Sequence, residues 1–430
     1  MNRRFLLASL AVLPLAAAVP TFAAQIGVNT PFPELSVERI NTLPVAQRQA
    51  WLDYLNRSKA AIAADQAALK AEREGMTTIP DGPKGGNGEA TMPLDKPAEW
   101  YGSAEAKAVA DNIVSFQTPA GGWGKNQPHN GPVRLKGQHY VANNMPPNQK
   151  PDDFDAPHLP GWGYVGTIDN DATITETRFL LKVFAATKVE AYRASALRGL
   201  QYLLNAQFPN GGWPQVWPLT GGYHDGMTLN DNAMSSVMQL MGDAGRGEGD
   251  FAAVPAELRT KTAAAETRAI QVLLDAQVII DGKRTLWAQQ YDPLTLTPTS
   301  ARNYEPPALS SSESASVLTY LMKLNAPSKA IVAAVHAGAA MLEKLKIEGM
   351  VFSKTPDGQD RLLTPKDGAG PLWSRYYDMK TLKPIFGNRS KTLHDTINDV
   401  EPERRRGYSW FNNSAASALS KYAKWKETHA

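Results

Sequence analysis

Two short clusters of acidic and amide side chains have the composition of a metal site. Asp169 lies in residues 166–173 and Asp231 lies in residues 229–232, and each cluster comes directly before a segment with helical spacing of apolar residues. Carboxylate and amide oxygens are the ligands that a hard cation such as Ca²⁺ prefers, although this spacing is not that of an EF-hand. Taken alone, Asp171 would more often cap the helix that follows. The two clusters can share one calcium ion only if the fold brings Asp169 and Asp231 together.

Arginine recurs beside aromatic residues in the second half of the chain. Arg302, Arg375 and Arg389 each lie within three residues of an aromatic side chain, in or beside segments of irregular sequence. The planar guanidinium group pairs with a carboxylate through two parallel N–H bonds. For residues 404–406, a run of three arginines, we favour a surface position or a structural ion pair, because charged loop residues are usually solvated. The other three form a set suited to an anionic ligand.

The elements that must position these residues repeat along the chain. A helical segment that ends in glutamine and runs into a loop with glycine and tryptophan recurs at intervals of about 70 to 90 residues, long enough for two helices per copy. These loops are residues 117–125, 207–215, 277–291 and a variant that ends at 372–377. Helical spacing marks residues 109–116, 173–185, 196–206, 232–241, 262–276, 312–324, 330–345 and 412–425.

Pairs of helices repeated around an axis predict a mainly helical toroid with its loops gathered at one mouth. Each loop tryptophan could wall a cleft or plug the core between helices. For Trp213 we predict the cleft wall, where it would contact a substrate.

The N-terminal quarter of the chain differs from this repeat. Residues 43–74 predict a helix or helical pair, and residues 77–94 have the glycine, proline and lysine of a loop. We therefore predict an N-terminal helical extension over residues 25–94, packed on a catalytic domain over residues 95–430. Residues 1–24 have two arginines, an apolar run and terminal small residues, as a signal peptide does. We expect a periplasmic or secreted protein.

The composition of the chain excludes several kinds of site and partner. The sequence has no cysteine, which excludes disulfides, thiolate nucleophiles and zinc–thiolate sites. A formal charge of +3 over 430 residues is not broadly basic, so we expect no nucleic-acid partner. The apolar run of the leader is too short for a membrane span, which needs about 20 residues. We expect no membrane partner and a monomer.

Several long motifs, taken together and in order, resemble those of pectate lyases of polysaccharide lyase family 10. They occupy residues 166–173, 210–215, 224–233, 302–305 and 388–410, and the resemblance runs from about Lys96 to the C-terminus. It implies an (α/α)₃ toroid, a Ca²⁺ cofactor and a polygalacturonate substrate that is cleaved by β-elimination.

The resemblance also implies roles for individual residues. Asp169 and Asp231 match the acids of the calcium site, with Asn170 beside the first as a substrate-binding residue. Arg302 and Arg375 match arginines that hold the substrate carboxylates. The catalytic arginine, which abstracts the C5 proton, matches Arg389. Family members often follow this arginine with an acidic residue and a glycine, whereas this chain has Ser390 and Lys391.

Two other functions fit parts of the sequence. A glycoside hydrolase on an α/α barrel needs two carboxyl groups, which Asp169, Asp171, Asp231 and Glu305 could supply. A non-catalytic oligosaccharide-binding protein would use the same residues without turnover.

Overall fold

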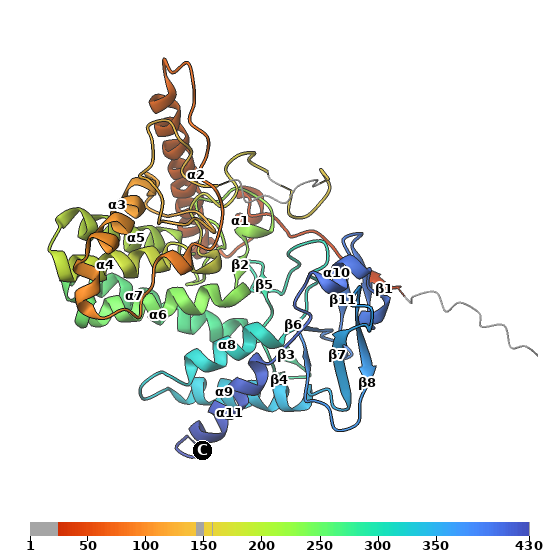
Figure 1. Cartoon of the computed structure of the whole chain (residues 1–430). Helices are drawn as coiled ribbons and strands as arrows, with labels where there is room; N and C mark the ends of the chain where they lie inside the picture. Colours follow the sequence, from red (N-terminus) through yellow and green to blue (C-terminus); the bar gives the residue numbers. More distant parts are fainter. Residues whose placement is uncertain (1–24, 143–149, 157, 430) are drawn as a thin grey trace, which may run out of the picture.

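Three helical hairpins follow one another along the middle of the chain in the computed structural model, which describes residues 25–142, 150–156 and 158–429 (Figure 1). The predicted signal peptide, residues 1–24, lies outside the described residues. The hairpins are α4 (Ile174–Thr187) with α5 (Glu190–Ala206), α6 (Ala233–Arg246) with α7 (Ala256–Ala276), and α8 (Ser311–Leu321) with α9 (Lys329–Lys344).

The hairpins stack into two layers. Helix α6 packs between α4 and α8 in one layer, and α7 packs between α5 and α9 in the other. Helix α3 (Ala104–Phe116) covers α4 and α5 at one end, and α11 (Ser414–Trp425) covers α8 and α9 at the other. The prediction of a mainly helical fold built from helix pairs is confirmed, and each segment with helical spacing contains a helix.

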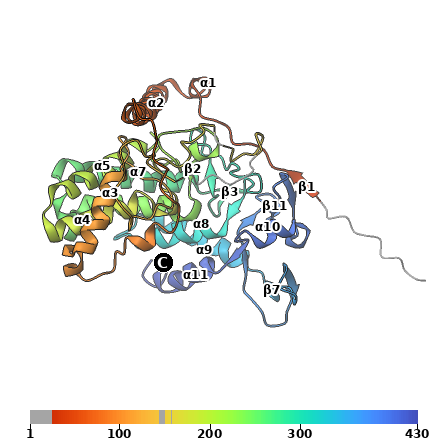
Figure 2. The same ribbon diagram turned by 45° about the horizontal axis from the view of Figure 1, so that its top comes forward.

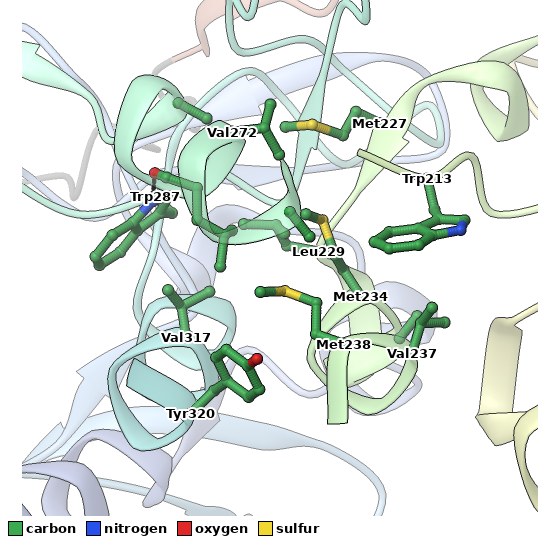
Figure 3. Packing of buried hydrophobic residues seen from close by; sticks show 14 of the residues in the cluster. Trp213, Met227, Leu229, Met234, Val237, Met238, Val272, Trp287, Val317 and Tyr320 are labelled. Carbon is green, nitrogen blue, oxygen red and sulfur yellow. Dashed lines mark hydrogen bonds between the residues drawn. The ribbon is translucent and has the colours of Figure 1, made fainter. Parts of the chain in front are cut away.

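Apolar residues at helical spacing explain why the layers hold together. In α6, Met234, Val237, Met238 and Met241 recur every three or four residues and are fully buried. Figure 3 shows Met234 and Met238 between Trp213 on one side and the side chains of α8 on the other. Full burial of one such side chain contributes about 2 kcal/mol, so this stripe fixes the helix against its neighbours.

The tryptophans of the repeated loops are core residues. Trp123, Trp213, Trp287 and Trp373 are all fully buried. Each indole N–H donates to a carbonyl in the last turns of the preceding helix, at 2.7 to 2.8 Å. The prediction that Trp213 walls the cleft is therefore wrong, because its ring plugs the core and its N–H caps the end of α5 at Leu203.

The repeated glutamines serve the same structural purpose. The side-chain amide of Gln207 donates to the carbonyls of Gly211, in its own loop, and Ala265, in the next hairpin. Gln117 and Gln277 make the equivalent pairs of bonds in their own copies of the loop. The repeat in the sequence thus records how consecutive hairpins are joined.

The N-terminal segment contains one long helix, as predicted, and one unexpected strand. Helix α1 (Val37–Ile40) is short, and α2 (Val45–Arg73) rises from the helical layers (Figures 1 and 2). Trp51 and Tyr54 of α2 pack on Phe208 of a repeated loop. Strand β1 (Gln25–Val28) joins β12 (Thr392–His394) and β11 (Phe386–Gly387) in a small sheet.

Short antiparallel ladders tie together the loops between the hairpins. Strand β2 (Met227–Thr228) pairs with β5 (Gln290–Tyr291), β6 (Leu309–Ser310) with β10 (Tyr376–Tyr377), and β9 (Trp373–Ser374) with β13 (Phe411–Asn412). Strands β3 (Ile279–Ile280) and β4 (Lys283–Arg284) form a tight hairpin, and β7 (Met350–Lys354) and β8 (Arg361–Pro365) form a hairpin with a longer loop. The helix α10 (Pro402–Arg406) completes the C-terminal part of this loop region. Within the described ranges, none of the helices has the length and apolar character needed to cross a membrane.

Candidate active site

The two acidic clusters form matching turns at the starts of α4 and α6. Asp169 opens the turn η3 (Asp169–Asp171), and Asp231 is the middle residue of η5 (Asn230–Asn232). Asn170, the middle residue of η3, has φ/ψ of 52°/42°, and Asp231 has 48°/38°. Asparagine and aspartate tolerate this left-handed conformation better than other residues with a Cβ. The two turns pack against each other, so the fold brings the clusters together.

Asn170, Asp171 and Asp231 face a common cavity instead of capping helices. A cavity of about 420 Å³ is lined by Asn170, Asp171, Asp231 and the buried Glu176, among other residues. Thr173, at the start of α4, donates its hydroxyl to the carbonyl of Thr167. The polar residues before α4 therefore belong to the cavity wall and the core around it.

Asp169 is held by a lysine. Lys125 Nζ lies 2.5 Å from Asp169 Oδ2, with side-chain exposures of 14% and 1%. Burial opposes the charge of Lys125, but Asp169 and Tyr164 together outweigh it, so the pKa of Lys125 lies above its ordinary value. The other carboxylate oxygen, Oδ1, is buried and has no hydrogen-bond partner among the described residues. Asp169 thus keeps one oxygen for a further ligand.

Asp231 meets Arg375. One guanidinium nitrogen of Arg375, Nη2, lies 3.3 Å from Asp231 Oδ1, 2.9 Å from Asn230 Oδ1 and 2.5 Å from Glu313 Oε1. Burial opposes the charge of Arg375, but the carboxylates of Glu313 and Asp231 and nearby tyrosines hold its pKa well above the ordinary value. The Asp231 side chain is half exposed, which leaves it accessible from the cavity.

Arg302 lies in a cationic part of the site. Its Nη1 is 3.4 Å from both the Tyr304 hydroxyl and Glu305 Oε1, which are long contacts. Burial and the charges of Arg302 and Lys125 lower the pKa of His224 to about 3, so this imidazole is neutral at neutral pH. The charge of Arg302 also opposes that of Lys125.

Arg389 is the most exposed of the three arginines. Its Nε and Nη2 each lie 3.1 Å from a different carboxylate oxygen of Glu403. This ion pair raises the pKa of Arg389 above its ordinary value. The guanidinium carbon lies 5.7 Å from the centre of the Tyr304 ring, whose hydroxyl contacts Arg302. Lys391, the departure noted in the sequence, pairs with Asp152 at 2.7 Å.

A hydrogen-bonded tyrosine connects the two sides of the site. The Tyr408 hydroxyl lies 2.7 Å from Glu305 Oε1, the same oxygen that Arg302 approaches. Its ring centre lies 5.1 Å from the guanidinium carbon of Arg375. A continuous series of contacts therefore joins Asp231 to Arg375 and Tyr408. It continues through Glu305 to Arg302, and through Tyr304 to Arg389.

Several of these residues escaped the sequence analysis. Lys125, Glu313 and Tyr408 lie in motifs that were noted, but their types gave no sign of what they would contact. Among residues 404–406, Arg405 makes the predicted structural ion pair, with Asp360. Arg404 also makes an ion pair, with Glu403 at 3.6 Å, and its guanidinium carbon lies 4.5 Å from the centre of the Tyr304 ring.

The residues present fit a calcium ion as a partial ligand set. Asp169 offers a buried carboxylate oxygen, Asp231 a half-exposed carboxylate, and Asn170 an amide beside them. Over residues 25–142, 150–156 and 158–429, no group of three or more His, Asp or Glu side chains could hold a metal ion alone. Water or a substrate carboxylate would have to complete the coordination, because Ca²⁺ takes six to eight oxygen ligands.

Comparison with known proteins gives consistent matches. The family described as pectic acid lyase matches residues 117–419. A family 10 polysaccharide lyase from Cellvibrio cellulosa is 31% identical with a TM-score of 0.64, over 77% of this chain and 96% of that chain. A mutant of a family 10 polysaccharide lyase from the same organism, in complex with trigalacturonic acid, is 31% identical with a TM-score of 0.63, over 78% of this chain and 99% of that one. No curated protein matches.

Proposed function

Because the chain belongs to the pectic acid lyase family, polysaccharide lyase family 10, we propose that it cleaves α-1,4-polygalacturonate by calcium-assisted β-elimination and leaves 4,5-unsaturated oligogalacturonates. Membership of this family makes the protein a polysaccharide lyase. The observation that carries the finer proposal is the continuous set of contacts from Asp231 through Arg375 to Arg302 and Arg389. These contacts bring a carboxylate oxygen ligand, Asp231, and the three guanidinium groups into one site.

β-Elimination explains why this site would need so many cations. The reaction removes the proton at C5 of a galacturonate, next to the C6 carboxylate, and then breaks the bond at C4. The negative charge of that carboxylate opposes the carbanion, so fixed positive groups must neutralise it. Arg375 would bind the carboxylate through its planar donors, since Glu313 and Asp231 keep it charged against the effect of burial.

Calcium would be held at Asp169 and Asp231, with Asn170 beside them. When bound, the ion supplies charge neutralisation at the substrate carboxylate. The unpartnered oxygen of Asp169 and the accessible carboxylate of Asp231 support this assignment. The partial ligand set also supports it, because a substrate carboxylate can then enter the coordination shell.

The proton acceptor is one of the two arginines that flank Tyr304. The sequence motif indicates Arg389, but this side chain is half exposed and held by two bonds to Glu403. The contacts of the Arg302 side chain with Tyr304 and Glu305 are long, at 3.4 Å, and its charge opposes that of Lys125. Tyr223 and Glu305 hold the pKa of Arg302 well above its ordinary value, against the effect of burial. A neighbouring cation disfavours the charged form of a base, so Lys125 and bound calcium would act in the opposite direction. We therefore assign proton abstraction to Arg302 and substrate binding to Arg389, which exchanges the two roles that the motif indicates.

The expected location and oligomeric state are also proposals. Residues 1–24 have the charge and apolar pattern of a signal peptide, which supports export to the periplasm or the medium. A monomer is sufficient, because the residues assigned to the reaction all come from one chain.

A single assay separates this function from its alternatives. Purified protein is incubated with polygalacturonate in two separate samples, one with chelator and one with added calcium. The ultraviolet absorbance of the 4,5-unsaturated product is recorded in each. We expect product only with calcium. Reducing ends without ultraviolet absorbance would instead identify a hydrolase, and saturable binding without either product would identify a binding protein.

A further inference from the structure

The N-terminal segment 25–32 crosses the two loops that carry Arg302 and Arg389. Strand β1 pairs with β12 through Gly27 opposite Leu393 and Val28 opposite Thr392. The backbone N–H of Asn29 then donates to the carbonyl of Lys391 at 2.7 Å. Figures 1 and 2 both show β1 beside the C-terminal part of the chain, and in this sheet β12 lies between β1 and β11. We call residues 25–32 the N-terminal strap.

The side chain of Asn29 in this strap binds the Arg302 loop at three points. Its Nδ2 lies 3.2 Å from the carbonyl oxygen of Arg302, 3.1 Å from that of Asn303 and 3.2 Å from that of Glu305. Asn29 is only 5% exposed, so water does not replace these bonds. A side-chain amide has two N–H groups, and here they converge on carbonyls that surround one tight turn. Asn29 therefore fixes the backbone from which Arg302 extends.

Asn303, next to Arg302, makes the complementary connection. Its Nδ2 donates to the carbonyl of Arg389 at 2.8 Å and to Asp153 Oδ1 at 2.8 Å. The loop of Arg302 is thus tied to the loop of Arg389 by Asn303, and both loops are tied to the strap by Asn29.

We propose that Asn29 is a positioning residue that sets Arg302 relative to Arg389, and that the N-terminal strap is part of the catalytic apparatus. The proposal rests on the proposed function. The contacts of the Arg302 side chain with Tyr304 and Glu305 are long, at 3.4 Å, so its placement depends on the backbone beneath it. A displacement of about 1 Å at a reacting group can reduce a rate on the order of 100-fold.

The test compares two variants of Asn29 in the full-length exported protein. Asn29→Ala removes the amide, and Asn29→Asp keeps its shape while removing the two donors. We expect both to lower kcat on polygalacturonate by roughly 10- to 100-fold, with KM within about twofold of wild type, because Arg375 still binds the substrate. The matched control is Asn210→Ala. It removes the hydrogen bond that the side-chain amide of Asn210, in another loop, donates to the carbonyl of Pro293, and it should leave kcat unchanged.

Hydrogen exchange gives a second measurement that does not need activity. The loop is closed by the N–H of Ala301 donating to the carbonyl of Glu305 and the N–H of Glu305 donating to that of Arg302. In Asn29→Ala, we expect the peptide that contains residues 301–305 to exchange at least fivefold faster, with the helices unchanged. If wild type does not cleave polygalacturonate, the proposed function fails, and this measurement alone still decides whether Asn29 positions the loop.

Other outcomes would overturn the proposal. The proposal is overturned if Asn29→Ala and Asn29→Asp leave both kcat and the hydrogen exchange of residues 301–305 unchanged. It is also overturned if the Asn210→Ala control loses kcat to the same extent. If Asn29→Ala does not fold, Ser300→Ala serves instead, because it removes the bond from Ser300 to the carbonyl of Thr30 in the strap. We then expect a two- to fivefold fall in kcat at constant KM, and an unchanged kcat would reject the role of the strap.

Discussion

The ammonium nitrogen of Lys125 lies 2.5 Å from Asp169 Oδ2, and the two side chains are almost completely buried. Removing one member of a buried ion pair leaves an uncompensated charge and costs about 3 kcal/mol or more. We expect Lys125→Ala to lower the free energy of unfolding by this amount in chelator, as measured by urea denaturation. Added calcium should restore part of the loss, because a cation bound at Asp169 replaces the missing charge.

The control for this variant is Lys182→Ala. Lys182 pairs with Asp250 at 3.0 Å, but this pair is partly exposed. Such pairs contribute about 0.2 to 1 kcal/mol, so the control should lose little stability. Equal losses in the two variants, or a Lys125→Ala protein that calcium does not stabilise, would contradict calcium binding at Asp169.

Arg302 and Arg389 should respond differently to truncation. We expect Arg302→Ala to lower kcat by about 10² to 10⁴, the usual contribution of a general base, with measurable binding of trigalacturonate remaining. Arg389→Ala should mainly raise KM, because we assign this side chain to substrate binding. Steady-state kinetics with polygalacturonate separates the two effects, with Arg246→Ala on the exposed end of α6 as the control. The reverse pattern would restore Arg389 as the proton acceptor.

Asp231 should control the calcium requirement. We expect Asp231→Ala to raise the calcium concentration for half-maximal activity by at least tenfold, because it removes one of few carboxylate ligands. The measurement is the rate of increase in ultraviolet absorbance, recorded at a series of calcium concentrations. Asp243→Ala, which removes the partner of Arg178 away from the site, is the control. An unchanged titration in Asp231→Ala would exclude ligation.

Local pattern explains how much of this molecule could be predicted. The helices follow from apolar spacing, and the packing of the two acidic turns follows from their equivalent places before α4 and α6. Within the turns, Asp231 is equivalent to Asn170 and not to Asp169. The burial of Trp213 could not be decided, because a core plug and a cleft wall have the same sequence pattern.

Contacts between distant segments explain what was missed. Asn29 binds carbonyls more than 270 positions away, and a lone asparagine near the start of a chain carries no sign of that role. Lys125 reaches Asp169 from a neighbouring loop, 44 positions earlier in the chain. Such pairs are set by tertiary packing, so a single sequence identifies the residues and not their partners.

Asp65 of α2 should make stability depend on pH. Burial raises its pKa from 3.8 to about 7, against the effect of the N–H of Ala120, which donates to it at 2.8 Å. The folded state therefore holds the proton more tightly than the unfolded state, so this stabilisation is complete below about pH 4 and is lost as pH rises through about 7. Asp65→Asn keeps the acceptor for Ala120 and cannot ionise. At pH 9 we expect its free energy of unfolding to exceed that of wild type by on the order of 2 kcal/mol.

The test for Asp65→Asn is a series of urea denaturation curves between pH 5 and pH 9. Asp53→Asn, on an exposed part of the same helix, is the control and should follow wild type at every pH. If Asp65→Asn instead lost stability with rising pH as steeply as wild type, another group would be responsible.

Trp213 should matter for stability and not for substrate affinity. Its ring is fully buried and its N–H donates to the carbonyl of Leu203 at 2.8 Å, so Trp213→Phe removes one of the two donors to that carbonyl, leaving the N–H of Gln207, and opens a space beside it. We expect a loss of about 1 to 3 kcal/mol in the free energy of unfolding, with an unchanged KM for polygalacturonate. Trp287→Phe is a matched comparison, because Trp287 makes the same bond to Leu273 in the next copy of the repeat, and it should lose a similar amount. A raised KM with wild-type stability in Trp213→Phe would show that this side chain reaches the substrate after all.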